Sequence, residues 1–203
     1  MGFFNTIKKF FNTKKKAKSW IIKGIALEKL GKHEEAIKYY DKALEICPNY
    51  AELWKLKGIA LEKLGRYREA SECYNKALEI NPNYAKSWKL KGIALEKVGR
   101  YEEAIKCYDK ALEINPNNTL AWKLKGIALE KLEKYEEAII CYDKALEINP
   151  NYTKVLRFKG NALEKLGRYE EAIKCYDKAL KINPKYFLAK IDKKRLEKIM
   201  SNK

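Results

Sequence analysis

Histidine is nearly absent from this sequence of 203 residues, which contains only His33. One imidazole cannot build a multi-histidine metal site, and it leaves little room for acid/base catalysis by histidine. His33 also stands where tyrosine recurs elsewhere in the chain, which indicates a packing role. We therefore expect no catalytic residue, no metal site and no cofactor, and we interpret the protein as a non-enzyme.

Long apolar runs are also lacking. The longest stretch without a charged residue runs from Ile114 to Trp122, nine residues. A membrane-spanning helix needs about 20 apolar residues, roughly twice that length. The chain is therefore not expected to cross a bilayer.

Paired cysteines are the third absence, because the sequence has five cysteines and no CxxC motif. Four of them, Cys73, Cys107, Cys141 and Cys175, follow one another at 34-residue steps. Helices that pack side by side lie about 10 Å apart, whereas a disulfide needs alpha carbons within about 7 Å. Unpaired thiols are typical of reducing compartments, so we expect a cytoplasmic protein.

What the sequence has in excess is positive charge, with a formal net charge of +17. Residues 1–16 contribute +5, the segment 153–186 another +5 and residues 187–203 another +4, so the charge gathers at the ends of the chain. A nucleic-acid channel would be basic throughout and would interleave aromatic side chains with the lysines. This distribution disfavours sequence-specific nucleic-acid binding and leaves weak, salt-sensitive binding at the basic ends as an alternative.

A period of 34 residues organises most of the chain. Trp20, Trp54, Trp88 and Trp122 keep this step, as do five glycines that begin at Gly24. Repeats of this length indicate solenoid architectures. The sequence therefore predicts five units flanked by shorter end segments: 1–16, then 17–50, 51–84, 85–118, 119–152 and 153–186, then 187–203.

Each unit reads as two amphipathic helices. In the second unit, apolar residues from Trp54 to Leu64 and from Ala70 to Ile80 recur three or four positions apart. Gly65 suits the left-handed turn between the two helices, and Pro82 ends the second helix. A hairpin this small cannot bury its apolar faces alone, so the units must stack.

The repeated residues resemble the signature of the tetratricopeptide repeat, and the resemblance covers all five units. The residues that carry it in the second unit are Trp54, Gly58, Leu61, Ala70, Tyr74, Ala77 and Pro82. The resemblance implies an all-α solenoid, a right-handed superhelix in which the first helix of each pair lines a concave groove. Two departures stand out, Leu156 in place of tryptophan and Glu133 in place of the turn glycine.

Helix geometry places three columns of residues on the face of the first helices opposite the core, where a groove would lie. These are our candidate ligand-binding residues. The basic column is Lys55, Lys89, Lys123 and Arg157; the apolar column is Ile25, Ile59, Ile93 and Ile127, ending at Asn161; the acidic column includes Glu62, Glu96 and Glu130.

The apolar column supports two interpretations. A row of exposed isoleucines is large enough to mark a binding surface for a peptide or helix of a partner protein. Alternatively, the isoleucines pack helix against helix between neighbouring units. Some tetratricopeptide domains hold a terminal carboxylate with lysine, arginine and asparagine over three units, but here only Asn161 stands at such an asparagine position. The sequence therefore favours a protein-interaction scaffold over a receptor for chaperone tails.

Another lysine column, Lys23 to Lys159, precedes the glycines. We expect its aliphatic stems to pack on the hairpins while the ammonium groups reach solvent.

Residues 1–16 form a separate basic segment, predicted to be an amphipathic helix. Aromatic and aliphatic side chains follow a helical face and lysines lie off it, a pattern typical of membrane-surface helices. The anchor residues would be Phe3, Phe4, Ile7, Phe10 and Phe11, with Lys8 and Lys9. The helix could instead cap the first unit or contact a partner, so a peripheral membrane location and self-association both remain open. Residues 187–203 read as a polar capping helix.

Overall fold

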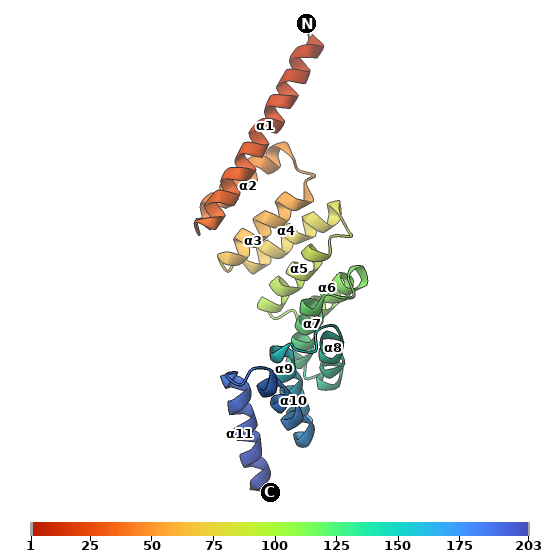
Figure 1. Ribbon diagram of the computed structural model, residues 1–203. Coiled ribbons are helices and arrows are strands. Elements are labelled where there is room, and N and C mark those ends of the chain that lie inside the picture. Colours follow the sequence, from red (N-terminus) through yellow and green to blue (C-terminus); the bar gives the residue numbers. More distant parts are fainter. Residues whose placement is uncertain (1, 203) are drawn as a thin grey trace. The chain divides into compact units, whose positions relative to one another are not determined.

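The computed structural model describes the backbone of residues 2–202 and the side chains of residues 15–202 (Figure 1). Over this range the chain forms eleven helices and no strand. It divides into two compact units, Met1–Arg100 and Tyr101–Lys203, which are described separately below.

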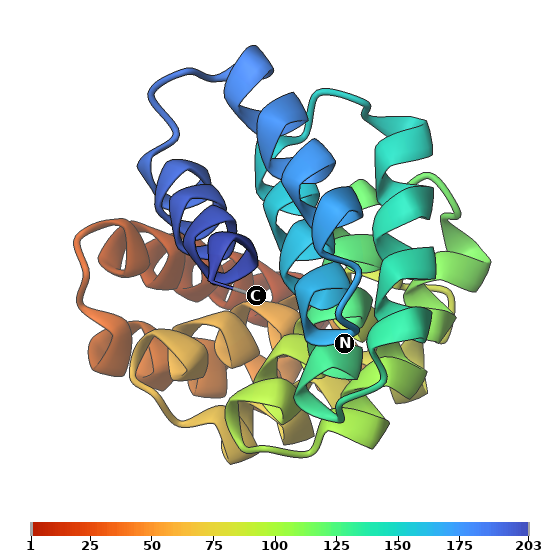
Figure 2. The same cartoon turned by 90° about the horizontal axis from the view of Figure 1, so that it is seen from below.

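The first unit contains five helices: α1 (Gly2–Lys29), α2 (His33–Ile46), α3 (Ala51–Lys63), α4 (Tyr67–Ile80) and α5 (Ala85–Lys97). α1 pairs with α2 and α3 with α4, and each pair packs against the next helix along the chain (Figures 1 and 2). α1 runs without a break through residue 16, where the sequence predicted a separate segment to end.

The second unit contains six helices: α6 (Tyr101–Ile114), α7 (Thr119–Lys131), α8 (Tyr135–Ile148), α9 (Thr153–Lys165), α10 (Tyr169–Ile182) and α11 (Phe187–Ser201). α7 pairs with α8 and α9 with α10, and α11 packs against α10. The starts of α3, α5, α7, α9 and α11 are 34 residues apart, so the period of the sequence is also the period of the helices.

Left-handed residues end the first helix of each hairpin, as predicted. Four glycines, from Gly31 to Gly167, have φ between 74° and 80°, and Glu133 adopts φ 60° at the equivalent turn. The left-handed region costs a residue with a Cβ about 1 kcal/mol more than glycine. The fourth hairpin therefore keeps the turn in spite of its glutamate.

The core of each hairpin is built around a glycine and a tyrosine. Tyr40, Tyr74, Tyr142 and Tyr176 are fully buried, and each ring lies against the glycine 16 residues before it in the sequence. A Cβ added to Gly58 would lie 2.5 Å from Cε1 of Tyr74, well inside van der Waals contact. Glycine is needed here because the tyrosine ring fills the space where a side chain would project.

Consecutive hairpins are joined by a repeated ion pair. Nζ of Lys57 lies 2.6 Å from Asp41 Oδ1, and Nζ of Lys125 lies 2.6 Å from Asp109 Oδ1. Lys159–Asp143 and Lys193–Asp177 repeat the contact at 2.5 and 2.6 Å. The lysine stems are largely covered, which confirms the expectation that this column packs on the hairpins.

α11 differs from the polar cap that we expected. Ala189 and Leu196 are buried, but Phe187, Leu188, Ile191 and Ile199 are exposed, Phe187 to 69%. Lys190, Lys194 and Glu197 occupy positions where the other first helices contact their partner helix, and in α11 no partner helix follows among the described residues.

Candidate functional site

The acidic column is held by the buried tyrosines. The hydroxyl of Tyr74 donates to Glu62 Oε2 at 2.9 Å, and the hydroxyl of Tyr142 donates to Glu130 Oε1 at 2.5 Å. Burial raises the pKa of both carboxyl groups, although the tyrosine hydrogen bonds act in the opposite direction. These glutamates therefore satisfy core hydroxyl groups, and Glu130 also lines a cavity. Glu96 belongs to the same column and also has an interaction of its own.

The basic column does not form a row of exposed ammonium groups. Lys55 is only 4% exposed, and its ammonium contacts Glu52 and the hydroxyl of Tyr84, the latter at 2.7 Å. Lys123 lies over the ring of Tyr152, 5.9 Å from its centroid. Most of this column is thus committed to partners within the protein.

Lys89 lies in a different environment from Lys55. Burial lowers the pKa of Lys89, and the nearby charge of Lys86 acts in the same direction. Its ammonium group is therefore less stable in the charged form than an ordinary surface lysine.

The structure supports both interpretations of the apolar column, each for different residues. In the first unit, Ile25, Ile59 and Ile93 are all partly exposed, and Ile25 and Ile59 pack against the core cluster. In the second unit, Ile127 lines a cavity of about 390 Å³. Asn161 lines the same cavity and accepts a hydrogen bond from the hydroxyl of Tyr176 at 2.8 Å.

This cavity combines an apolar surface with a charged rim. Phe158 of α9 faces it and stacks on Tyr142, with ring centroids 6.1 Å apart. Glu130 lies at its edge with the raised pKa described above. The complete lining is Ile127, Glu130, Lys131, Tyr135, Phe158, Asn161, Glu164, Lys165 and Arg195.

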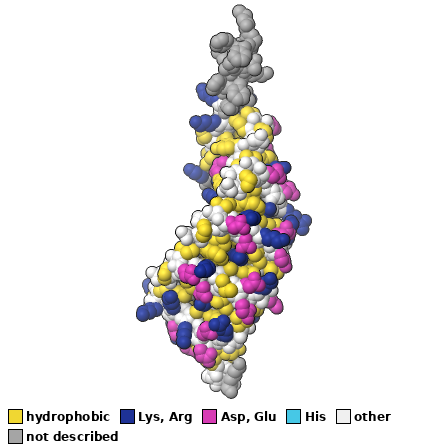
Figure 3. All heavy atoms as spheres, turned by 90° about the vertical axis from the view of Figure 1, so that its right-hand side faces the viewer, with side chains coloured by type: hydrophobic (Ala, Val, Ile, Leu, Met, Phe, Trp, Pro, Cys, Tyr) yellow, Lys and Arg dark blue, Asp and Glu magenta, His cyan; other side chains and the backbone are white. Residues whose placement is uncertain are grey.

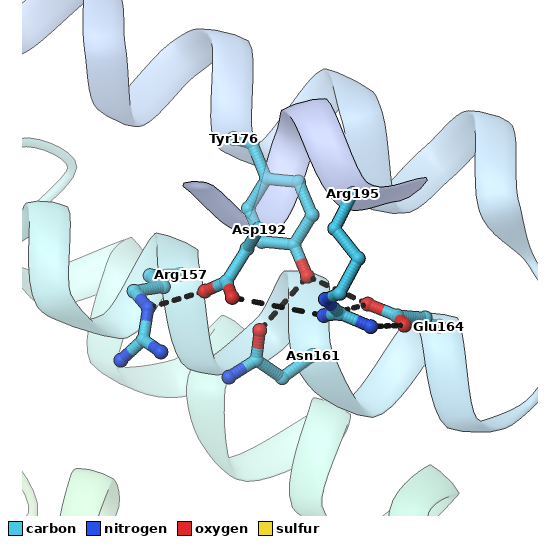
Figure 4. Close-up of polar contacts among 6 residues, drawn as sticks. All are labelled: Arg157, Asn161, Glu164, Tyr176, Asp192 and Arg195. Atoms are coloured by element: carbon cyan, nitrogen blue, oxygen red, sulfur yellow. Dashed lines mark hydrogen bonds and ion pairs between the residues drawn. The ribbon is translucent and has the colours of Figure 1, made fainter. Parts of the chain in front are cut away.

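α11 contributes Arg195 to the lining of the cavity. Arg195 makes a two-point contact with Glu164, in which its Nη2 lies 2.9 Å from Oε2 (Figure 4). Nε of Arg157 lies 2.6 Å from Asp192 Oδ2, so this member of the basic column is also paired. Figure 4 shows Asn161 between these two ion pairs, below the hydroxyl of Tyr176.

Sequence reasoning found Ile127, Glu130 and Asn161 but missed Phe158, Tyr135 and Arg195. The signal for Arg195 was present, because it lies 34 residues after Asn161 and so continues the apolar column by one step. Phe158 replaces the leucine of Leu56 and its copies, a change of size that the sequence also displays.

The anchor residues predicted near the N-terminus lie outside the described side chains. Phe3, Phe4, Ile7, Lys8, Lys9, Phe10 and Phe11 belong to α1, whose backbone alone is described there. Their role at a membrane or a partner stays a prediction. Among the described residues, no helix is long and apolar enough to span a bilayer, and no cluster of three metal-binding side chains occurs.

The described surface mixes charges of both signs. Figure 3 shows Lys and Arg side chains interspersed with Asp and Glu, with apolar side chains visible between them. This face therefore presents neither a uniformly basic nor a uniformly acidic field to a partner.

Comparison with known families shows what the hairpins are. Tetratricopeptide repeat models match residues 16–83, 85–118, 119–152 and 154–186. Comparison with curated proteins gave no match.

Solved structures share the fold. YrrB, described as a tetratricopeptide repeat protein with an unusual peptide-binding site, is 26% identical over 93% of this chain and 97% of its own, with a TM-score of 0.79. MamA from Desulfovibrio magneticus is 25% identical over 84% of this chain and 97% of its own, with a TM-score of 0.80. Another MamA structure is 24% identical over 84% and 93%, also at 0.80. These matches confirm the predicted class, an all-α solenoid of helical hairpins.

Proposed function

Because the chain belongs to the tetratricopeptide repeat family, we propose that it is a scaffold that binds a segment of a partner protein in the cavity formed by α7, α9 and α11. The observation that carries the proposal is the partly exposed apolar surface of Ile127 and Phe158, which line one cavity together with charged side chains. Scaffolds of this family are generally not enzymes, and the proposal assigns no reaction to the chain.

The cavity suits one or two side chains of a peptide. Its volume of about 390 Å³ lies within the roughly 300–1,000 Å³ of ligand pockets. An apolar side chain placed between Ile127 and Phe158 would bury surface at about 25 cal/mol per Å². The peptide-binding site described for YrrB supports a ligand of this class here.

The rim determines which charges the segment should carry. Glu130 loses solvation by burial, so a lysine or arginine of the partner near it would favour the charged carboxylate. Lys131 and Lys165 also line the cavity, are exposed and favour an acidic residue. We therefore infer an apolar anchor flanked by charges of both signs.

The test is selection of peptides on the full chain, followed by two matched substitutions. Ile127→Glu should weaken the selected peptides at least tenfold in a titration, because it places a charge in the apolar part of the cavity. Ile140→Glu is the control, since Ile140 lies on α8 of the same unit, is 60% exposed and does not line the cavity. Selected peptides that bind Ile127→Glu as tightly as Ile140→Glu would contradict the proposal, provided both variants keep the helical circular dichroism of the parent.

A further inference from the structure

The tryptophans of the repeat make one contact that recurs in three hairpins. Each indole Nε1 donates a hydrogen bond to the carbonyl oxygen of the proline six residues earlier, in the preceding turn. The distances are 2.7–2.8 Å for the pairs Trp54–Pro48, Trp88–Pro82 and Trp122–Pro116. The chain thus uses its own indole rings to cover each turn.

A lysine ammonium group lies over the face of each of these rings. The distance to the ring centroid is 5.2–5.7 Å, within the range of a cation–π contact. The pairs are Lys57–Trp54, Lys91–Trp88 and Lys125–Trp122. An indole in this position therefore meets an acceptor at its edge and a cation at its face.

In the fifth repeat the indole is missing and its two partners remain. Leu156 stands in place of tryptophan, and no donor in the described part of the chain reaches the carbonyl oxygen of Pro150. Lys159 keeps its ion pair with Asp143 at 2.5 Å. A cavity of about 620 Å³ opens here, and Pro150, Leu156, Lys159 and Cys175 are among its lining residues.

The break in the tryptophan column coincides with cavities that reach the proline turn. At the next turn, Lys190 follows Pro184 in place of tryptophan, and a cavity of about 470 Å³ is lined by both residues. Beside Trp54, by contrast, a cavity of about 440 Å³ is lined by the indole and does not reach Pro48. The proline turn is thus reached by a cavity at both positions where tryptophan is replaced.

The cavity at Pro150 is the stronger candidate for a binding site. Leu156 is buried beside Leu146 and gives it an apolar floor, and Cys175 adds a side wall from α10. Burial raises the pKa of this thiol, so it stays protonated and apolar in character. The cavity at Pro184 is smaller, and its lining comes from α10, α11 and the turn between them.

We propose that the Pro150 cavity binds a tryptophan side chain of a partner polypeptide. The indole would donate to the Pro150 carbonyl oxygen and lie beside Lys159, as the chain's own indoles do at the other turns, and it would rest on Leu156. A side chain without a donor would fill the space but leave the carbonyl unpaired. Tryptophan is also enriched among the residues that dominate protein interfaces.

This site is independent of the cavity formed by α7, α9 and α11, because no residue lines both. The probe for it is N-acetyl-tryptophanamide, titrated into the ¹⁵N-labelled full chain. We expect saturable amide shifts at Asn151, Lys159 and Cys175. The variant Ile127→Glu should bind the probe like the parent, which separates this proposal from the function proposed above.

Two variants and one altered probe make the test specific. Leu156→Trp should abolish the shifts, because its own indole would occupy the cavity. Trp122→Leu should create a second site, with new shifts around Asn117. The 1-methyl form of the probe, which cannot donate, should bind the parent at least fivefold more weakly.

Three results would overturn the proposal. They are shifts that stay absent from the Pro150 region at millimolar probe, a folded Leu156→Trp variant that binds as the parent does, and equal binding of the methylated probe. The last measurement uses the parent chain alone, so it decides the matter even if a variant fails to fold.

Discussion

The second and fifth hairpins follow the same repeat, and three of the positions at which they differ lie on the surfaces of their first helices that matter here. α3 and α4 carry Trp54, Leu56 and Ile59, whereas α9 and α10 carry Leu156, Phe158 and Asn161 at the equivalent positions. In the second hairpin Leu56 and Ile59 pack against the core, and Trp54 lines a cavity that does not reach the proline turn. In the fifth they line two separate cavities. The comparison teaches that the repeat supplies the framework and that departures from it supply the binding surfaces.

The largest expected effect concerns the contact between a glycine and a buried tyrosine ring, which the second and fifth hairpins share. Gly58→Ala and Gly160→Ala would each place a Cβ 2.4–2.5 Å from a buried tyrosine ring. The free energy of unfolding should fall by about 2–3 kcal/mol in both, since overpacking outweighs the gain in helix propensity. Urea unfolding measures it. Adding Tyr74→Leu to Gly58→Ala should recover part of the loss, and a gain in stability from either single substitution would contradict the packing described here.

A second substitution tests the ion pair between Arg157 of the fifth hairpin and Asp192 of α11. Asp192→Ala removes the partner of Arg157, and both side chains of this pair are largely buried. We expect a loss of about 2 kcal/mol, because removing one partner leaves the other charge partly buried. Hydrogen exchange of the α11 amides measures it. Glu79→Ala, which breaks the exposed Lys76–Glu79 pair, is the control and should cost less than about 0.5 kcal/mol.

Substitutions at the left-handed turns should change the free energy of unfolding by smaller amounts, with opposite signs in the fourth and second hairpins. Glu133→Gly should raise the free energy of unfolding by about 1 kcal/mol, because glycine adopts φ 60° without strain. Gly65→Ala should lower it by a similar amount in the second hairpin. Thermal unfolding of both variants checks the signs, and equal signs would refute the explanation of the turn.

The smallest effect concerns pH. Burial raises the pKa of Glu62 and Glu130 in the folded chain, so their contribution to stability is fully present at low pH and is lost as the pH rises through the folded pKa. Glu62→Gln should therefore flatten this part of the pH dependence and stabilise the fold slightly at pH 7. Urea unfolding from pH 4 to pH 7 measures the difference, and Glu79→Gln on the surface of the same hairpin should leave the profile unchanged.

Much of the fold could be predicted from the sequence because the repeat restates the same constraints five times. Glycine at the turns, tyrosine opposite glycine, and proline after each second helix all have local reasons, and the structure shows each one. The left-handed conformation of Glu133 was predictable for the same reason, since the surrounding helices fix the turn.

The candidate site was only partly predictable. Lys55 was placed on the inner face, but its partner Tyr84 lies 29 residues later, and helix geometry alone does not show that a tyrosine covers it. Arg195 was missed because the repeat pattern was followed only to its last complete unit. The hydrogen bonds from the tyrosine hydroxyl groups to the acidic column could not be predicted. They depend on the distance between the two helices of a hairpin, which the sequence does not give.

The Lys–Asp pairs between successive hairpins have a consequence for how such a chain changes length. Each pair joins a lysine on the first helix of one hairpin to an aspartate on the second helix of the preceding hairpin, as in Lys125–Asp109 and Lys159–Asp143. Duplication of a whole 34-residue repeat that carries this aspartate would place the same lysine beside the same aspartate, whereas the second repeat has Asn75 at that position. The ion pair at the new interface would therefore form without any compensating substitution, and the protein can gain such a repeat while the neighbouring interfaces keep their ion pairs.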